Sequence, residues 1–344
     1  MADDEPDLDQ LLDLATPWCL RVAATLRLPA LIAEGQHDVA DLAAAARCDR
    51  DALHAILDHL VAKGVFQQPA PGCFESNRMA EQLSDRFLDL EGIGGRMART
   101  WGTLLEYVRT GQPAYQTVFG RPFWEDLAAH PDIAADFDAL MGAAGHGVPD
   151  FDIELAGGWD AIRTMVDVGG GTGAMLAALL RRHPHVHGIL VDLPGTVARA
   201  DQALTGTTLA GRVSVHGQSF FDPLPIQADL YLLKNVLNDW PDQETVAILR
   251  NCAQAAKATG AIAVLGGVAP DDAPRSLGID MLVAGGKTST ITQFTELARQ
   301  AGLGITAART QASGRYVVEC RPQRDRPQRD RPQRDRPQRD REHT

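Results

Sequence analysis

Two aspartates and a glycine-rich turn are the residues of this chain best suited to chemistry. The chain reads Met-Val-Asp-Val-Gly-Gly-Gly-Thr-Gly from Met165 to Gly173, and Asp192 ends the apolar segment that begins at Gly188. Glycines let a backbone turn tightly and approach a ligand closely. An acid at the tip of the following strand can bind a pair of ribose hydroxyls. The spacing therefore predicts a nucleotide-type site that contains Asp167, the glycines and Asp192.

The glycine turn alone leaves alternatives open. Gly169, Gly171 and Ala174 also match the looser dinucleotide pattern G-x-G-x-x-A. A tight turn without any ligand is the plainer alternative. The apolar run before the turn indicates a buried strand, and residues 174–183 are strong helix formers. The order strand, turn, helix, strand is thus predicted, and the downstream sequence has to decide the ligand.

Alternating strands and helices from Gly158 onward must position these residues. This order predicts an α/β fold with a mostly parallel sheet and helices on both faces. The last predicted strand, 315–319, is expected at an edge. The helices between the strands include 242–257 and 290–302, and the predicted strands are 164–168, 188–192, 212–216, 229–233, 261–265 and 315–319.

The first 150 residues are predicted to be mostly helical. Apolar residues follow a helical stripe through 49–63, and Gly64 is placed to end that helix. Val65-Phe66 and Cys73-Phe74 flank Pro69-Ala-Pro-Gly, which indicates a small hairpin. Helix, helix, hairpin is a winged-helix pattern, which can bind DNA or form dimers. The candidate recognition helix carries Asp49, Asp51 and Asp58, so dimerisation is the expected role.

Composition excludes several partners. The 344 residues carry a net charge of −12, which argues against nucleic acid. From Arg321 to Thr344 the chain holds nine Arg and five acidic residues, so the rest of the protein is about −16. This tail repeats Arg-Pro-Gln-Arg-Asp four times and is predicted to be disordered. A role in solubility or weak association is possible for it, and repeat expansion without function is favoured.

Neither a membrane span nor a secretory signal is predicted. No apolar run reaches about 18 residues, and the N-terminal segment is acidic. The five cysteines are scattered, which is typical of free thiols in a cytoplasmic protein. No metal site is expected, and we interpret His183, His185 and His187 as solvent-exposed. The aromatic-rich span 95–145 is either core or a cap over a flat substrate, with core favoured.

Five motifs in order resemble one enzyme family. They are Asp167-Val-Gly-Gly-Gly-Thr-Gly, Asp192-Leu-Pro, Phe220-Phe-Asp-Pro-Leu-Pro, Lys234-Asn-Val-Leu-Asn-Asp-Trp and Gly285-Gly-Lys. Together they resemble the class I S-adenosylmethionine-dependent O-methyltransferases of the plant caffeate and actinobacterial polyketide-tailoring type. The resemblance covers about residues 10–320. It implies a Rossmann-like seven-stranded catalytic sheet behind an N-terminal winged-helix dimerisation domain, and makes dinucleotide binding remote.

The resemblance also implies roles for individual residues. Asp167, Gly169 and Gly171 should hold the methionine part of S-adenosylmethionine, and Asp192 with Leu193 its ribose. The adenine should stack on Phe220 beside Ser219, and Lys234 and Trp240 should approach the cofactor. The candidates for the acceptor site are Arg21, Trp101, Met141, Asn235 and Met281.

The chain departs from the family at the position of the catalytic base. The histidine that usually precedes Asp-Trp is Asn238 here. An amide has no titratable base near neutral pH. The family also tends to place two acids around that histidine, where this chain has Gly266 and Thr288.

Three explanations of this departure remain open. Methyl transfer depends largely on proximity and alignment, so an acceptor that is already anionic needs no enzyme base. Alternatively, another group such as His146 supplies the base, although an exposed loop histidine is the favoured interpretation of that residue. Finally, the chemistry has shifted to C- or N-methylation, hydroxylation, decarboxylation or ring formation. Asn238 is our candidate for orienting the acceptor without deprotonating it.

The sequence therefore predicts a homodimeric, cytoplasmic methyltransferase that acts on a small aromatic or polyketide-like natural-product intermediate and releases S-adenosylhomocysteine. Nucleic acid and membrane are not expected partners. A noncanonical tailoring enzyme is the leading alternative, and a winged-helix ligand-sensing regulator a remote one. The predicted parts are a dimerisation domain over 1–100, a helical cap over 101–157, a catalytic domain over 158–320 and a disordered tail over 321–344.

Overall fold

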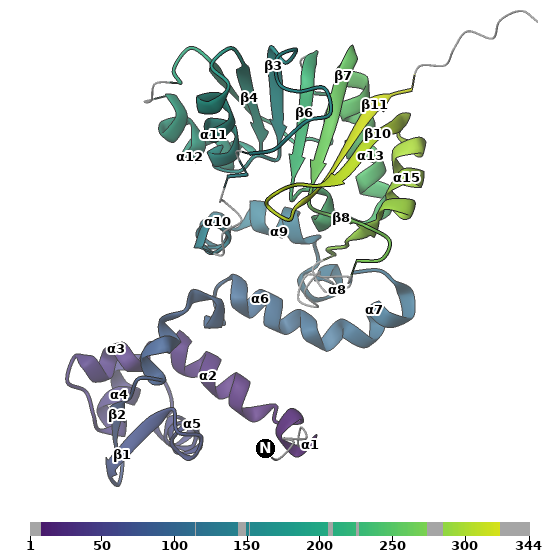
Figure 1. Ribbon diagram of the computed structural model, residues 1–344. Helices are drawn as coiled ribbons and strands as arrows, with labels where there is room; N and C mark the ends of the chain where they lie inside the picture. The colour runs from purple at the N-terminus through teal and green to yellow at the C-terminus, as the bar shows by residue number, and fades with distance from the viewer. Residues whose placement is uncertain are drawn as a thin grey trace, which may run out of the picture.

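The computed structural model describes residues 8–113, 115–143, 149–150, 152–205, 209–224, 227–273 and 285–323. The predicted tail over 321–344 lies outside these residues, apart from its first three positions. Three layers of the molecule follow one another along the chain (Figure 1). Helices α6 to α10 lie between a small N-terminal domain and a large sheet domain.

The N-terminal domain has the predicted order of helices and hairpin. Its core gathers Leu42, Leu53, Leu57 and Leu60, all almost fully buried. Asp38 and Asp49 accept hydrogen bonds from the backbone at the starts of α4 and α5, as helix caps do. The elements are α1 (Leu8–Leu11), α2 (Ala15–Thr25), α3 (Leu28–Ala33), α4 (Val39–Ala46), α5 (Arg50–Ala62), the antiparallel hairpin β1 (Phe66–Ala70) and β2 (Cys73–Ser76), and the short helices η1 (Ala80–Ser84) and η2 (Arg86–Leu88).

The middle segment packs around its own aromatic core. Tyr115 and Phe123 are buried there, and Phe119 and Phe137 pack against them. The favoured interpretation of this span as core is thus confirmed for these residues. The elements are α6 (Ile93–Thr100), η3 (Trp101–Thr103), α7 (Leu104–Thr110), α8 (Tyr115–Phe119), α9 (Phe123–Ala129) and α10 (Pro131–Ala143).

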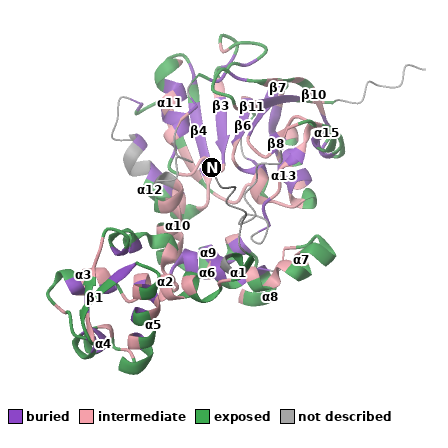
Figure 2. Ribbon diagram, turned by 60° about the horizontal axis from the view of Figure 1, so that its bottom comes forward, coloured by how far each residue is buried: buried purple, intermediate pink, exposed green. Residues whose placement is uncertain are grey.

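The C-terminal domain is a seven-stranded sheet with helices on both faces (Figures 1 and 2). Its strand order is β10-β11-β7-β6-β3-β4-β5, and five of its strands are parallel. The strands of this sheet are β3 (Thr164–Val168), β4 (His187–Asp192), β5 (Val213–Gly217), β6 (Ala228–Lys234), β7 (Ala256–Leu265), β10 (Leu303–Thr310) and β11 (Tyr316–Pro322). The helices of the domain are α11 (Ala174–Arg182), α12 (Pro194–Thr205), η4 (Leu237–Asp239), α13 (Asp242–Ala255) and α15 (Ile291–Gln300). The short strands β8 (Val268–Ala269) and β9 (Ser289–Thr290) form a separate parallel pair.

Two hydrophobic cores lie on the two faces of this sheet. Val166 of β3 packs in the core that includes residues of α13 and α15, whereas its neighbour Met165 packs in the core that includes residues of α11 and α12. Successive side chains of a strand point to opposite faces, so both faces of the central strands are apolar. The predicted α/β fold is confirmed.

The predicted position of one strand within the sheet is wrong. The strand predicted over 315–319 is not an edge, because β11 pairs with β7 on one side and β10 on the other, antiparallel to both. The edge strand on this side of the sheet is β10, which the apolar pattern does not indicate because Thr306, Ala307 and Ala308 lack large side chains. No helix among the described residues is long and apolar enough to cross a membrane.

Candidate active site

The predicted cofactor residues meet at the carboxyl edge of the parallel strands. Asp167 lies near the end of β3, Asp192 ends β4 and Lys234 ends β6. Strand β3 pairs with both β4 and β6, which brings the three ends together. Ligands of open α/β sheets bind at this edge.

Asp192 is held in place by two backbone donors. Its Oδ2 accepts from the Gly171 N–H at 2.8 Å, and its Oδ1 accepts from the Leu193 N–H at 2.7 Å. Burial raises the pKa of Asp192, and these two hydrogen bonds act in the opposite direction because they stabilise its charge. The carboxylate is therefore fixed in position before a ligand arrives.

The glycine turn offers one open position. Gly169, Gly171 and Gly173 all have positive φ angles, at 67°, 59° and 74°. A Cβ added at Gly169 would meet Val236 at 2.8 Å, and one at Gly173 would meet Leu204 at 2.7 Å. A Cβ at Gly171 would meet nothing within 4 Å. The backbone at Gly171 can thus be approached closely by a ligand.

Asp167 is a buried acid with an unused oxygen. It is 1% exposed, and its Oδ2 has no hydrogen-bond partner. Burial and the nearby Asp192 raise the pKa of Asp167 to about 7, and Lys234 acts in the opposite direction. An unpaired buried oxygen calls for an explanation. A cationic amino group would satisfy it, so the acid fits the amino-acid end of S-adenosylmethionine.

Four aromatic rings form a wall beside this site. Trp240 packs edge-on against Phe220 and Phe221, with centroids 5.9 and 4.8 Å apart. It also stacks on Trp124 of α9 at 6.3 Å. Ser219 shapes the loop, because its Oγ accepts from the Phe221 N–H at 3.2 Å. A flat ring system can stack on such a wall.

The middle helices reach the cofactor residues at two points. Trp124 is one, and the ion pair between Asp138 of α10 and Arg199 of α12 is the other. Both charges of that pair influence the pKa of Asp192. Parts of the segment predicted as a cap therefore lie next to the cofactor residues.

The residues at the expected base constellation also meet in space. Asn238 donates from Nδ2 to Asp239 Oδ1 at 2.8 Å, and its own Oδ1 is buried without a partner. A Cβ on Gly267 would meet the Asn238 nitrogen at 2.8 Å, and one on Gly266 would clash with Asn235. Whichever of Gly266 and Gly267 occupies the position of the family's acid, that position has no side chain in this protein.

The third position of the constellation is close as well. The Lys287 N–H donates to the Asn238 carbonyl at 2.7 Å, and the Ser289 N–H donates to the Gly267 carbonyl at 2.9 Å. Thr288 lies between these two anchors. Burial raises the pKa of Asp239, the neighbour of Asn238, to about 7. Asp239 is thus the titratable carboxyl that directly contacts Asn238.

The acceptor candidates are placed less uniformly. Arg21 lies in the N-terminal domain, where it donates to the carbonyls of Phe87 at 2.8 Å and Gly94 at 3.3 Å. Asn235 has a left-handed φ of 54° and donates from its backbone to Leu265, beside the base constellation. Trp101 and Met141 are half-buried in η3 and α10, and His146 and Met281 lie outside the described residues.

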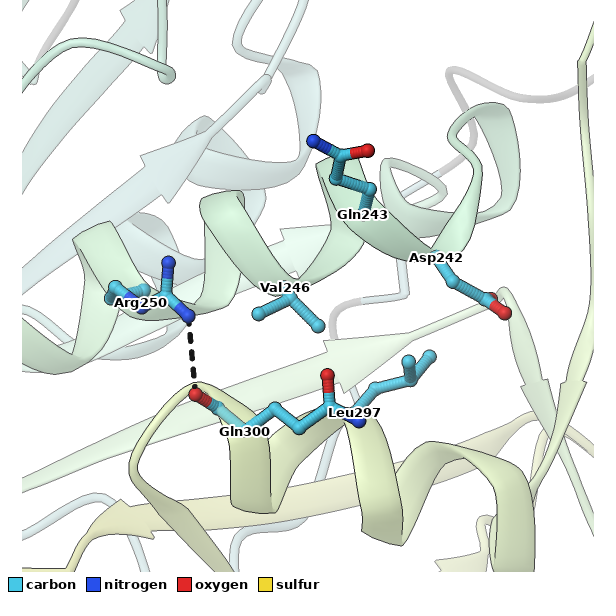
Figure 3. A pocket seen from close by; sticks show the side chains of 6 residues that line it. All are labelled: Asp242, Gln243, Val246, Arg250, Leu297 and Gln300. Atoms are coloured by element: carbon cyan, nitrogen blue, oxygen red, sulfur yellow. Dashed lines mark hydrogen bonds between the residues drawn. The ribbon is translucent and has the colours of Figure 1, made fainter.

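Two other features are not part of this site. A pocket between α13 and α15 is lined by none of the residues above, and Arg250 on its rim donates to the Gln300 carbonyl (Figure 3). The prediction of three exposed histidines is wrong for His183, which is half-buried because it stacks on Trp159 at 4.2 Å. No metal-binding cluster occurs in the described part of the chain.

Sequence reasoning missed Asn251, which holds the aromatic loop. Its Nδ2, on α13, donates to the carbonyls of Phe220 at 2.9 Å and Phe221 at 2.8 Å. An asparagine within a helix carries no sequence signal of such a contact. It also missed Trp124 and Asp239 as neighbours of the site, since their partners are set by the fold.

Comparisons with known proteins agree with this arrangement. A family model of the O-methyltransferase domain matches residues 101–304, and one of the O-methyltransferase dimerisation domain matches residues 8–86. The chain therefore belongs to the O-methyltransferase family, whose members are S-adenosylmethionine-dependent enzymes with a dimerisation domain before the catalytic domain.

Three relatives are similar over most of their length. A 2,7-dihydroxy-5-methyl-1-naphthoate 7-O-methyltransferase of Streptomyces carzinostaticus is 42% identical, covering 88% of this chain and 93% of that protein. Aclacinomycin 10-hydroxylase of Streptomyces purpurascens is 39% identical, covering 90% and 88%. The structure of an O-methyltransferase of neocarzinostatin biosynthesis, with S-adenosylmethionine and 2-hydroxy-5-methyl naphthoic acid, has a TM-score of 0.77 at 39% identity, covering 93% and 99%.

Proposed function

We propose that this protein transfers the methyl group of S-adenosylmethionine to a hydroxyl of a small, flat aromatic acceptor. The observation that carries the proposal is the meeting of two acids, an open glycine and an aromatic wall at one sheet edge. A relative named as a hydroxynaphthoate O-methyltransferase, and a solved O-methyltransferase structure that contains a hydroxynaphthoic acid, support an acceptor with fused rings. A natural-product intermediate of this shape is the expected substrate.

The chain's own residues would bind and align the reactants. Asp192 would hold the ribose hydroxyls, and Asp167 the amino group of the cofactor. When bound, S-adenosylmethionine supplies an electrophilic methyl group on a sulfonium. The Trp124–Trp240 contact would exclude water above the cofactor, which strengthens the electrostatic interactions below it.

Asn238 would anchor a second hydroxyl of the acceptor, beside the oxygen that receives the methyl group, without removing a proton from either. Its Nδ2 is engaged by Asp239, so Oδ1 is the atom left to accept a hydrogen bond. Because an amide cannot act as the base, the reactivity of the acceptor then depends on its own acidity. Acidic phenols and carboxylates are the favoured acceptors.

The experiment that tests this proposal uses S-adenosylmethionine with a labelled methyl group. The protein is incubated with hydroxynaphthoates, simple phenols and aromatic acids, and products are identified by mass spectrometry. We expect the label on oxygen, and a rate that rises with pH through the pKa of each acceptor. A rate that follows one enzyme pKa for every acceptor would mean that a protein base exists after all.

One observation favours a second candidate function. All three positions of the usual base constellation lack a titratable side chain, and the 39% identical relative is named as a hydroxylase. A tailoring reaction that retains the methyl group on the cofactor is therefore the alternative. Conversion of an acceptor without incorporation of label would favour this alternative over methyl transfer.

We also propose that the protein acts as a homodimer. The match to the dimerisation domain supports this, as do the exposed leucines of residues 8–14, which contain α1 and are called the α1 segment; Leu11 and Leu14 are 69% and 75% exposed. Apolar side chains gathered on one surface mark protein interfaces.

A further inference from the structure

A group of four charged residues extends the cofactor site toward the C-terminal hairpin. Asp167 and Lys234 belong to the sheet edge already described. Arg315 lies in the turn between β10 and β11, and Asp150 lies in the segment that precedes β3. The two acidic and two basic side chains come from four different segments of the chain.

The hairpin turn reaches this edge because of the strand register. Val317 of β11 pairs with Leu265, the last residue of β7. Strand β11 runs antiparallel to β7, so the residues just before Val317 lie at the carboxyl edge of the parallel strands. Arg315 is two residues before Val317. It thus lies at the same edge as Asp167 and Lys234.

Asp150 fixes the Arg315 side chain at this edge. Asp150 is 8% exposed, and its Oδ2 lies 3.0 Å from the Arg315 Nε. The Ser313 hydroxyl donates to the same oxygen at 3.4 Å. The Asp150 N–H contacts the Met175 sulfur at 3.2 Å, which ties this segment to the first turn of α11, next to the glycine turn.

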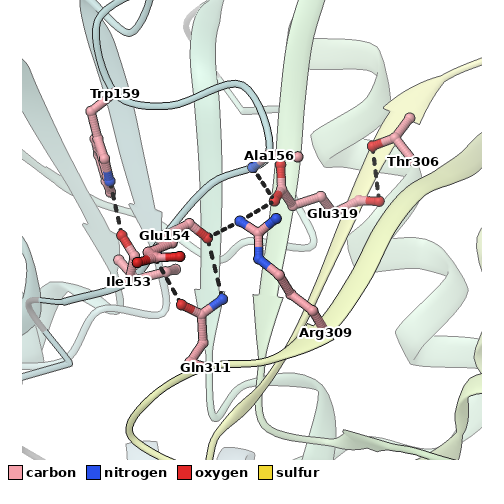
Figure 4. A network of polar contacts seen from close by, with 8 residues as sticks. All are labelled: Ile153, Glu154, Ala156, Trp159, Thr306, Arg309, Gln311 and Glu319. Carbon is pink, nitrogen blue, oxygen red and sulfur yellow. Dashed lines mark hydrogen bonds and ion pairs between the residues drawn. The ribbon is translucent and has the colours of Figure 1, made fainter.

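Further contacts make the hairpin a rigid support. Figure 4 shows Glu154 and Ala156 hydrogen-bonded to residues of this hairpin. Gln311 accepts from the Glu154 N–H at 2.9 Å, Arg309 donates to the Glu154 carbonyl at 2.6 Å, and Glu319 accepts from the Ala156 N–H at 2.6 Å. These bonds fix the segment that carries Asp150 against the hairpin that carries Arg315.

Arg315 and Lys234 lie at the same edge of the sheet, because Lys234 of β6 pairs with Leu265 of β7 and Leu265 pairs with Val317 of β11. The pKa of Lys234 is lowered first by burial and next by the charge of Arg315, whereas Asp167 and Asp150 act in the opposite direction. The positive charges of Arg315 and Lys234 repel each other, and an anion bound between them would offset this repulsion. The amino-acid end of S-adenosylmethionine carries such an anion, its carboxylate, beside the ammonium that Asp167 can accept.

We propose that Arg315, held by Asp150, forms with Lys234 a site for the carboxylate of the cofactor's amino-acid end. The turn that carries Arg315 lies beyond residue 304, where the match to the O-methyltransferase domain ends. Arg315 is therefore an additional binding residue that the motifs of the family do not include. The proposal rests on the cofactor site of the proposed function, and is independent of the acceptor and the reaction.

Two ligands separate a binding role from a structural one. S-adenosylhomocysteine carries the amino-acid end, whereas 5′-methylthioadenosine has the same nucleoside and thioether without it. Their affinities are measured by calorimetry on the full chain. We expect Arg315→Gln to weaken S-adenosylhomocysteine about ten-fold, the loss of one charge-assisted hydrogen bond, and to leave 5′-methylthioadenosine within two-fold of the unchanged protein.

Two further variants complete the experiment. Arg321→Gln is the matched control, because Arg321 is an arginine at the far end of the same hairpin, where it donates to the Thr259 carbonyl at 3.1 Å. We expect it to leave the ratio of the two affinities unchanged. Arg315→Lys keeps the positive charge and should restore most of the S-adenosylhomocysteine affinity, which also gives a folded variant if Arg315→Gln does not fold.

The outcomes distinguish this inference from the proposed function. Equal weakening of both ligands by Arg315→Gln, or no weakening of either, would overturn the role of Arg315 while the cofactor site stands. Failure of the unchanged protein to bind S-adenosylhomocysteine would instead overturn the cofactor site itself.

Discussion

At the scale of single residues, the two acids of the sheet edge have different tasks. Asp192 is engaged by two backbone donors, whereas Asp167 keeps a buried oxygen without a partner. In the proposed function, Asp192 is already oriented to bind the two ribose hydroxyls, whereas the free oxygen of Asp167 would bind the cofactor's ammonium. Their substitution should therefore have different consequences.

Asp192→Ala should weaken S-adenosylhomocysteine binding by about 1–3 kcal/mol, the usual loss for hydrogen bonds to a charged group. Calorimetry measures this directly. Asp152→Ala is a suitable control, since Asp152 is an exposed acid that forms an ion pair with Arg182. Unchanged affinity in Asp192→Ala would mean that the ribose lies elsewhere.

Asp167→Asn should stabilise the fold and weaken cofactor binding. The pKa of Asp167 is about 7 in the fold against 3.8 in a model compound, so the folded state binds more protons between these values. Stability then falls as pH rises from about 4 to 7, because ionisation of the buried acid is unfavourable. The variant should melt at a higher temperature than the unchanged protein at pH 8, with a smaller gain at pH 5.

The same ionisation should appear in binding. The ionised form of Asp167 attracts the cofactor's ammonium, so affinity for S-adenosylhomocysteine should increase from pH 6 to pH 8. Asp167→Asn should bind more weakly and flatten this dependence, whereas Asp239→Asn should retain it. A slope that survives in Asp167→Asn would assign the titration to another group.

At the scale of elements, the turn after β3 determines which glycines can change. Gly171 and Gly211 both have positive φ, at 59° and 83°, and an added Cβ meets nothing within 4 Å at either position. Alanine should cost each turn about 1–2 kcal/mol of stability. Only Gly171→Ala should also lose cofactor affinity, by ten-fold or more, because its Cβ enters the ligand's space.

Thermal melting and calorimetry on both glycine variants check this prediction. Gly211 lies between α12 and β5, away from the acids, and serves as the matched control. If Gly171→Ala binds the cofactor as tightly as Gly211→Ala, the backbone at Gly171 is not in contact with the ligand.

Elements also show how far a sequence can be interpreted. The strands that carry Asp167, Asp192 and Lys234 at or near their ends were predictable, because most of their residues are apolar and polar residues or glycines flank them. Strand β10 was not, since its small residues give no alternation. The insertion of β11 between β7 and β10 depends on long-range pairing that no local pattern encodes.

The site was predictable to a similar extent. Motif order was sufficient to bring Asp167 and Asp192 together as candidate cofactor acids, and the absence of a base at Asn238 was evident from its neighbour Asp-Trp. The amide's bond to Asp239, the stacking of Trp124 on Trp240 and the hydrogen bonds of Asn251 come from residues distant in space or without a motif. Such contacts require the fold.

At the scale of the whole molecule, the exposed apolar residues point to an assembly. Leu8, Leu11, Leu12 and Leu14 of the α1 segment are all more than 60% exposed, an arrangement that is unfavourable in water. The double substitution Leu11→Glu and Leu14→Glu should shift a dimer to a monomer in analytical ultracentrifugation, because each charge would be buried in the interface.

Met79→Glu is the control for this prediction, since Met79 is an apolar residue of the same domain that is also exposed, at 53%, but lies outside the α1 segment. A dimer that persists in the double variant would place the interface on another surface. Dissociation in both variants would mean that the interface extends beyond the α1 segment.

The stacked tryptophans have a consequence for observation as well. Trp124 belongs to the middle helices and Trp240 to the sheet domain, and their planes are inclined by 25°. Two indoles this close couple their electronic transitions, so the pair should give a near-ultraviolet circular dichroism signal that depends on their mutual orientation. A change in this signal when a ligand is added would report, without any added dye, a change in the relative orientation of the middle helices and the sheet domain.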